Sequence, residues 1–133
     1  MVLKMNKKLF IVLAILLAGM MFSACGTKVK DFNYRADSAG IFIISYQGTS
    51  KSVCIPEKIN NTPVVIIGDN AFKNKGLKKV KLPKTLKVLG RGAFVGNNLK
   101  TITLPDSLEM IYDPAFDENV NVKNRKVAVE EQE

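Results

Sequence analysis

Lysines dominate the residues whose chemistry could define a site, and they crowd into the middle of the chain. The sequence carries 20 Lys and Arg against 12 Asp and Glu, for a formal charge of +8. The run comprises Lys73, Lys75, Lys78, Lys79, Lys81, Lys84, Lys87, Arg91 and Lys100, with no acid before Asp106. Such a basic stretch attracts polyanions such as sulfated glycans, anionic lipids or nucleic acid, although lysines also keep a surface soluble.

Residues for catalysis or metal binding are scarce. The chain has no histidine, which excludes a Ser-His-acid triad and a histidine metal site, and its two cysteines are too few for a zinc cluster. The acids Asp113, Asp117 and Glu118 lie close in sequence, but a glycosidase pair would need aromatic residues and a cleft around it. The sequence therefore predicts no enzyme, no metal and no cofactor.

An internal repeat positions these residues. Residues 80–83 recur at 102–105 and residues 92–94 at 114–116, both with an offset of 22 residues, and a third Ala-Phe pair lies at 71–72. A period of about 20 to 29 residues is typical of a leucine-rich-repeat solenoid, in which stacked turns share one core. We expect a mainly β fold: about three turns of short stacked parallel strands with an N-terminal β-hairpin cap.

Each repeat strand has an inward and an outward side. Val80 and Leu82 alternate with Lys79 and Lys81, so the apolar residues point into the core, and Pro83 ends the strand. The outward columns of three strands are the predicted partner-binding residues: Ser52, Cys54, Lys79, Lys81, Thr101 and Thr103.

Stacking the turns also pairs some of the lysines with acids. Neighbouring strands lie about 4.8 Å apart, close enough for ion pairs along a column. The predicted pairs are Lys84 with Glu57 and Asp106, Arg91 with Asp69 and Asp113, and Lys87 with Glu109. The cations left without such a partner are the polyanion-binding candidates: Lys75, Lys78, Lys79, Lys81 and Lys100.

The repeat resembles the BspA-like, or treponemal-type, leucine-rich repeats of bacterial surface proteins. Their pattern of strand, Leu-Pro, apolar pair, Gly and Ala-Phe is matched over about residues 41–122. The first unit is five residues longer than the second between its proline and its Phe72, and a turn at residues 60–63 absorbs the extra length. The resemblance implies adhesion or recognition at the cell surface or in the periplasm, through contacts with host matrix proteins, host cells or other bacteria.

The N-terminus reads as an export signal. Residues 1–24 combine three lysines, a short apolar run and small residues before Cys25, which is typical of a cleaved signal peptide. The small residues followed by cysteine resemble a bacterial lipobox, although Phe22 stands where leucine is commoner. This resemblance implies lipidation of Cys25 and membrane anchoring; plain secretion and an uncleaved anchor are the alternatives.

The two cysteines link these alternatives. If the protein is secreted without a lipid, Cys25 and Cys54 can form a disulfide in an oxidising compartment. If Cys25 is lipidated, Cys54 is left alone on the outward side of its strand near Lys81. A nearby ammonium favours a thiolate, but an inert cysteine is the commoner outcome.

The chain divides into a signal peptide at 1–24, a tether at 25–31, a repeat domain at 32–122 and a charged tail at 123–133. We expect a hairpin of residues 32–34 and 41–46 to cover the first edge of the solenoid. The sequence thus predicts a protein that binds a macromolecular partner, with a protein as the expected partner and no nucleic acid. Polyanion binding by the lysines and self-association through the C-terminal edge are the alternatives.

Overall fold

The computed structural model describes residues 27–126 and 128–130, with side chains placed over 27–126. A short 3-10 helix, η1 (Val29–Asp31), precedes eleven strands. These are β1 (Phe32–Asp37), β2 (Gly40–Tyr46), β3 (Ser52–Cys54), β4 (Lys58–Ile59), β5 (Thr62–Ile67), β6 (Lys79–Lys81), β7 (Val88–Leu89), β8 (Thr101–Thr103), β9 (Met110–Tyr112), β10 (Asn121–Lys123) and β11 (Ala128–Glu130).

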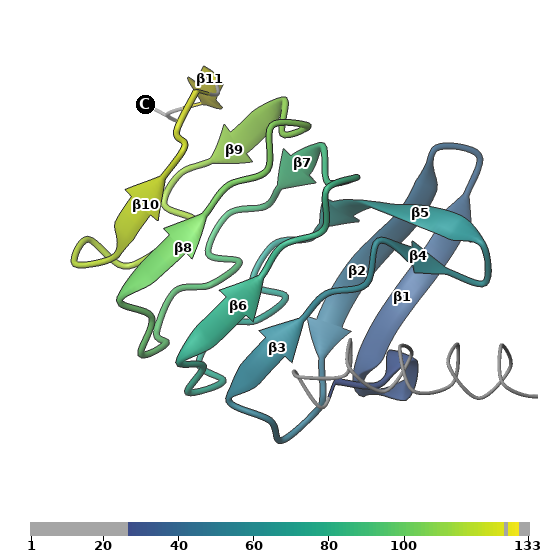
Figure 1. Ribbon diagram of the computed structural model, residues 1–133, viewed down its shortest axis with the longest axis horizontal. Helices are drawn as coiled ribbons and strands as arrows, with labels where there is room; N and C mark the ends of the chain where they lie inside the picture. Colours follow the sequence, from purple (N-terminus) through teal and green to yellow (C-terminus); the bar gives the residue numbers. More distant parts are fainter. Residues whose placement is uncertain (1–26, 127, 131–133) are drawn as a thin grey trace, which may run out of the picture.

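The strands form a β-solenoid with almost no helix, which confirms the predicted fold class. One side of the solenoid is a continuous sheet in the order β1-β2-β5-β7-β9-β11. The other side carries β3, β6, β8 and β10, which alternate with the strands of the first side along the chain (Figure 1). The solenoid has about four turns rather than about three, because β10 and β11 stack on β8 and β9.

Aromatic rings form a column through the core. The rings of Tyr46, Phe72, Phe94 and Phe116 are stacked, with centroids 5.4, 5.0 and 5.7 Å apart in that order. Phe72 and Phe94 are fully buried, whereas Phe116, at the end of the column, is half-buried. Each buried ring contributes about 1.5 to 3 kcal/mol, so the column accounts for the repeated Ala-Phe pairs.

Asn97 holds two turns together from within. Its Nδ2 donates hydrogen bonds to the carbonyl oxygens of Phe72 and Phe94, both at 2.8 Å. Its Oδ1 accepts from the backbone N–H groups of Lys75 and Leu77, both at 3.0 Å. The side chain therefore satisfies four backbone groups of turns that have no regular secondary structure, a role that the repeat pattern alone did not indicate.

The N-terminal hairpin and the longer first unit are as predicted. β1 pairs antiparallel with β2, which in turn pairs parallel with β5, so the hairpin covers the first edge of the continuous sheet. β4 and β5 form a second hairpin around Asn60 and Asn61, whose φ angles are 48° and 63°. Two positive φ values are what a tight two-residue turn requires, and asparagine tolerates them.

The C-terminal segment differs from the prediction of a charged tail over 123–133. Residues 128–130 form β11, which runs parallel to β9. The reason is the register: Val129 pairs with Ile111, which itself pairs with Leu89. The parallel ladder of the continuous sheet thus extends into a stretch that its composition had predicted to be a tail.

Candidate binding face

The predicted partner-binding residues lie on the side formed by β3, β6, β8 and β10, which we call the split face. Lys79, Lys81, Thr101 and Thr103 are exposed, while Ser52 and Cys54 are half-buried. Of the inward residues between them, Val53 and Ile102 are buried and Val80 is half-buried. Their alternation follows from the period of two along each strand. In the β3–β6 pair, Cys54 lies opposite Lys81, as the repeat predicts.

The split face is divided between β6 and β8. β3 pairs with β6, and β8 pairs with β10, but among the described strands no ladder joins β6 to β8. At the strand ends, the N–H of Ile55 donates to the Lys81 oxygen, and that of Leu104 to the Lys123 oxygen, both at 3.0 Å. Leu82 occupies the same repeat position as Ile55 and Leu104. Its N–H, however, makes no hydrogen bond to the Thr103 oxygen in the described chain.

A groove of about 430 Å³ lies at this break. Its rim is polar, formed by Lys79, Lys81, Lys84, Thr101 and Thr103. Its floor is apolar and includes Leu82, Ile102 and Leu104, which are at most 7% exposed. No carboxylate lines the groove. Asp106, which follows the floor in sequence, accepts a hydrogen bond from Asn124 Nδ2 at 2.8 Å. The groove therefore combines uncompensated positive charge with an apolar base.

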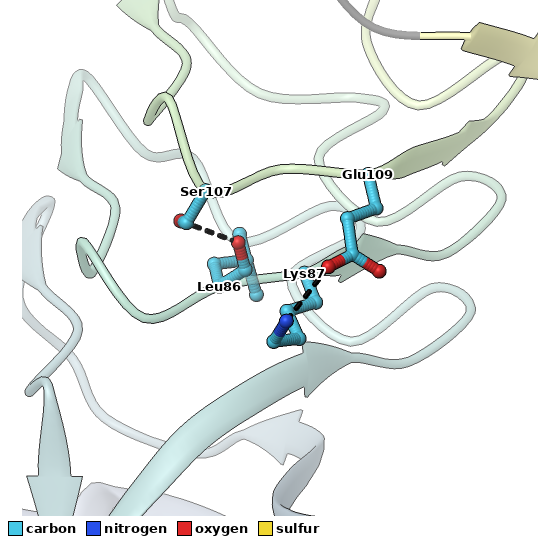
Figure 2. A network of polar contacts seen from close by, with 4 residues as sticks. All are labelled: Leu86, Lys87, Ser107 and Glu109. Carbon is cyan, nitrogen blue, oxygen red and sulfur yellow. Dashed lines mark hydrogen bonds and ion pairs between the residues drawn. The ribbon is translucent and has the colours of Figure 1, made fainter.

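Of the three predicted sets of ion pairs, one is correct. Lys87 Nζ lies 2.7 Å from Glu109 Oε1, next to a hydrogen bond from Ser107 Oγ to the Leu86 carbonyl oxygen (Figure 2). Both side chains of the ion pair are more than half exposed, so the pair is worth under about 1 kcal/mol.

The other two sets were wrong. Asp69 accepts the backbone N–H of Arg91 rather than its guanidinium, and Asp113 pairs with Arg125 at 3.2 Å. Lys84 forms no ion pair among the described residues. The repeat fixes which turns are neighbours, but a surface ion pair contributes too little energy to fix where long side chains point.

Only two of the five polyanion-binding candidates line the groove. Lys79 and Lys81 line the groove, whereas Lys75, Lys78 and Lys100 do not. The backbone of Lys75 is engaged: its carbonyl oxygen accepts from Lys51 Nζ at 2.7 Å. Lys84, which was predicted to pair with Glu57 and Asp106, lines the groove instead.

The start of the described chain lies against the split face. The N–H of Cys54 donates to Thr27 Oγ1 at 3.0 Å. Cys54 is disulfide-bonded, so the alternative of a thiolate beside Lys81 is wrong. Cys25 and the predicted signal peptide lie outside the described residues, as does the partner of the Cys54 disulfide.

The described residues offer few other sites. Residues 27–126 and 128–130 contain no group of three or more His, Cys, Asp or Glu side chains that could hold a metal ion. Over the same ranges no helix is long and apolar enough to cross a membrane. A second hollow, of about 460 Å³, lies at the C-terminal end, where Phe116, Val120 and Val122 are rimmed by Asp117 and Glu118.

The stacked parallel strands and the exposed split face define a β-solenoid repeat protein. A family model described as a BspA type leucine rich repeat region matches residues 46–131, with 6 copies. The chain therefore belongs to the BspA-type leucine-rich repeat family. Repeats of this family are typically non-enzymatic scaffolds that suggest a protein-interaction role, and its members are generally surface or exported bacterial proteins.

Two solved structures resemble this one. A leucine-rich repeat protein from Bacteroides capillosus is 21% identical with a TM-score of 0.54, covering 79% of this chain and 98% of that one. A leucine-rich repeat protein from T. pallidum is 21% identical with a TM-score of 0.48; the match covers 73% of this chain and spans 63% of the T. pallidum chain. The first likeness shows the fold alone. No curated protein matches the sequence.

Proposed function

We propose that the protein is an exported recognition module that binds a protein partner through the split face. The observation that carries this proposal is the groove between β6 and β8, because four of the six residues that the repeat pattern puts forward line it. A groove with an apolar floor and a polar rim can supply burial and specificity together, as protein-binding sites require. The same repeat has no comparable break between β5, β7 and β9.

Site-directed photo-crosslinking in the native host tests the face. A photoreactive side chain at Thr103, which is exposed on the split face, is expected to capture a defined protein. The same group at Glu109, exposed beside the continuous sheet, serves as the control. Changing Lys81 and Thr103 together to alanine should then abolish capture of that protein from a neighbouring position such as Thr101, with the circular dichroism spectrum unchanged. Equal capture from both faces would contradict the proposal.

Export is supported by two observations. The sequence of residues 1–24 is typical of a signal peptide, and the disulfide at Cys54 suits an oxidising compartment. The sulfur of Cys25 can carry a lipid or join a disulfide, but it cannot do both. The lipobox-like pattern favours a lipid-anchored protein at the cell surface or in the periplasm, whereas the disulfide favours a secreted one.

The intact mass of the protein from its native host separates these two forms. An acylated species that begins at Cys25 and is lost on Cys25→Ala would establish the lipid anchor. An unmodified species whose mass rises by about two protons on reduction would establish the secreted, disulfide-bonded form. A species that still contains residues 1–24 would contradict cleavage of the signal peptide.

Self-association through the C-terminal end is a second candidate. The hollow there exposes part of Phe116, the last ring of the aromatic column, beside Val120 and Val122. An apolar end of a repeat stack is a surface on which another repeat can dock. Val122→Pro, which breaks β10, should then abolish concentration-dependent dimers in analytical ultracentrifugation. A monomer at all concentrations would exclude this candidate.

A further inference from the structure

We infer that the groove between β6 and β8 takes an extended acidic peptide segment of the partner, with an apolar side chain between two carboxylates. This inference rests on the proposed function, since it specifies what the split face would recognise. Two features of the groove carry it: the spacing of its lysines and the apolar residues that line it.

The lysine spacing matches a strand. Lys79 and Lys81 lie two residues apart on β6, and both are exposed at the rim. Side chains at alternate positions of a strand point the same way and are about 7 Å apart. Carboxylates at positions i and i+2 of an extended peptide have the same separation, so one peptide can face both ammonium groups. Lys84 adds a third positive charge at the end of β6.

The floor accounts for the apolar residue between the carboxylates. Leu82, Ile102 and Leu104 are already buried, but Val80 and Pro105, which also line the groove, are half-buried. An apolar peptide side chain against Val80 and Pro105 would gain about 25 cal/mol for each Å² of apolar surface that it buries, whereas a sulfated glycan, which is polar throughout, would not. The floor therefore favours a peptide over a polysaccharide.

The break in the ladder gives the groove its place. The Leu82 N–H would reach the Thr103 oxygen if β6 and β8 were paired like their neighbours, but no hydrogen bond joins them in the described chain. Cα atoms of β6 and β8 still lie within 8 Å of each other, which is less than the roughly 9.6 Å that a strand between them would need. The peptide therefore lies over the groove, across the rim lysines, and not as a strand between β6 and β8.

The full-length protein can be tested by fluorescence anisotropy with a labelled peptide, Gly-Ser-Glu-Leu-Glu-Ser-Gly. The double variant Lys79→Gln, Lys81→Gln should weaken binding about fivefold or more, as expected for two partly exposed ion pairs. The matched control Lys58→Gln, Lys73→Gln removes the same charge from exposed residues that do not line the groove, and it should leave binding nearly unchanged.

A pair of variants at one position separates charge from steric effects. Thr103→Glu places a carboxylate on the rim and should weaken binding, whereas Thr103→Lys should strengthen it. A loss in both variants would mean that the groove is blocked without regard to charge, which would overturn the acidic preference. Peptides with Gln-Leu-Gln or Glu-Ser-Glu in place of Glu-Leu-Glu should both bind more weakly.

Two outcomes would overturn the inference. One is equal loss in the groove variant and in its matched control, with a heparin oligosaccharide bound more tightly than the peptide; this would indicate diffuse polyanion binding. The other is no peptide binding at low salt. If photo-crosslinking from Thr103 still captures a protein, the binding face stands and only the acidic peptide is wrong. If crosslinking fails as well, the proposed function fails with it.

Discussion

The two sides of the solenoid are made by the same repeat, yet one is a continuous sheet and the other is interrupted. On the continuous side β5, β7 and β9 pair in series, and hydrogen bonds at the corners add to the ladders: the N–H of Lys87 donates to Val65, and that of Glu109 to Lys87, both at 2.8 Å. On the split face the pairing stops between β6 and β8.

This difference separates stability from recognition. The continuous sheet joins every turn to the next and can hold the stack together without help from the other side. The split face is therefore free to present an incomplete ladder, with an apolar floor and unmatched lysines. A repeat protein can carry a binding groove on one side because neighbouring turns need only one uninterrupted series of contacts to remain stacked.

The largest expected effect concerns the core that both sides share. Phe94→Ala should cost about 3 to 5 kcal/mol of unfolding free energy, because Phe94 is fully buried between Phe72 and Phe116. Phe116→Ala should cost clearly less, since its ring is half-buried at the end of the column. Urea unfolding of both variants measures the difference. Equal losses would show that the column does not end at Phe116.

The next effect tests whether the continuous side is the more tightly packed of the two. A Cβ on Gly90, just after β7, would lie 2.5 Å from the Asp69 nitrogen and 2.6 Å from the Gly68 carbonyl carbon. Gly90→Ala should therefore destabilise the protein by about 1 to 3 kcal/mol.

The matched comparison for Gly90→Ala is a substitution on the split face that introduces a larger side chain. Thr103→Glu lies at an exposed rim position and should change stability by less than about 0.5 kcal/mol. Thermal unfolding of both variants decides the point. A greater loss for Thr103→Glu would mean that the split face, not the continuous sheet, holds the turns together.

A smaller effect is expected for the charged side chains. Lys87→Ala removes the ion pair with Glu109 beside the continuous sheet and should cost about 0.2 to 1 kcal/mol, weakening further with added salt. Lys81→Ala on the split face should leave stability unchanged while reducing partner capture. A double-mutant cycle with Glu109→Ala isolates the ion pair; a coupling energy of zero would show that the pair contributes nothing.

The smallest effect is a loss of stability at high pH through Tyr46, at the end of β2. Burial raises the pKa of Tyr46 above its ordinary value of 10.0, and the negative charge of Asp31 raises it further. The hydrogen bond to the Ser50 backbone lowers the pKa, but by less than the other two effects raise it. The unfolded chain therefore ionises first, and stability that is fully present below pH 10 declines above it. Tyr46→Phe should remove this part of the decline; an unchanged pH profile would contradict the assignment.

Sequence alone predicted the parts of the fold that repeat. The Ala-Phe pairs located the aromatic column, the alternation around Val80 and Ile102 located the split face, and the residues around Asn60 located the extra turn. These features follow from burial and backbone conformation, which residue type reports directly.

The parts that the sequence did not predict depend on how neighbouring turns lie relative to one another. Leu82 and Leu104 occupy the same repeat position, yet only Leu104 donates across a ladder, so residue type could not locate the break. Likewise, the repeat predicted Arg91 as the partner of Asp113, but Arg125 takes that place, and the energy of such a surface pair is small. The groove was therefore missed, although four of its rim residues were named.

Amide hydrogen exchange measured by NMR tests the break in the split face most directly. Ile55, Leu82 and Leu104 occupy equivalent repeat positions and are all at most 7% exposed, but only the amides of Ile55 and Leu104 cross a ladder. Because the Leu82 amide alone lacks that hydrogen bond, its exchange is expected to be faster than that of the other two. Equal protection of all three amides in the free protein would show that β6 and β8 are paired and would contradict the groove.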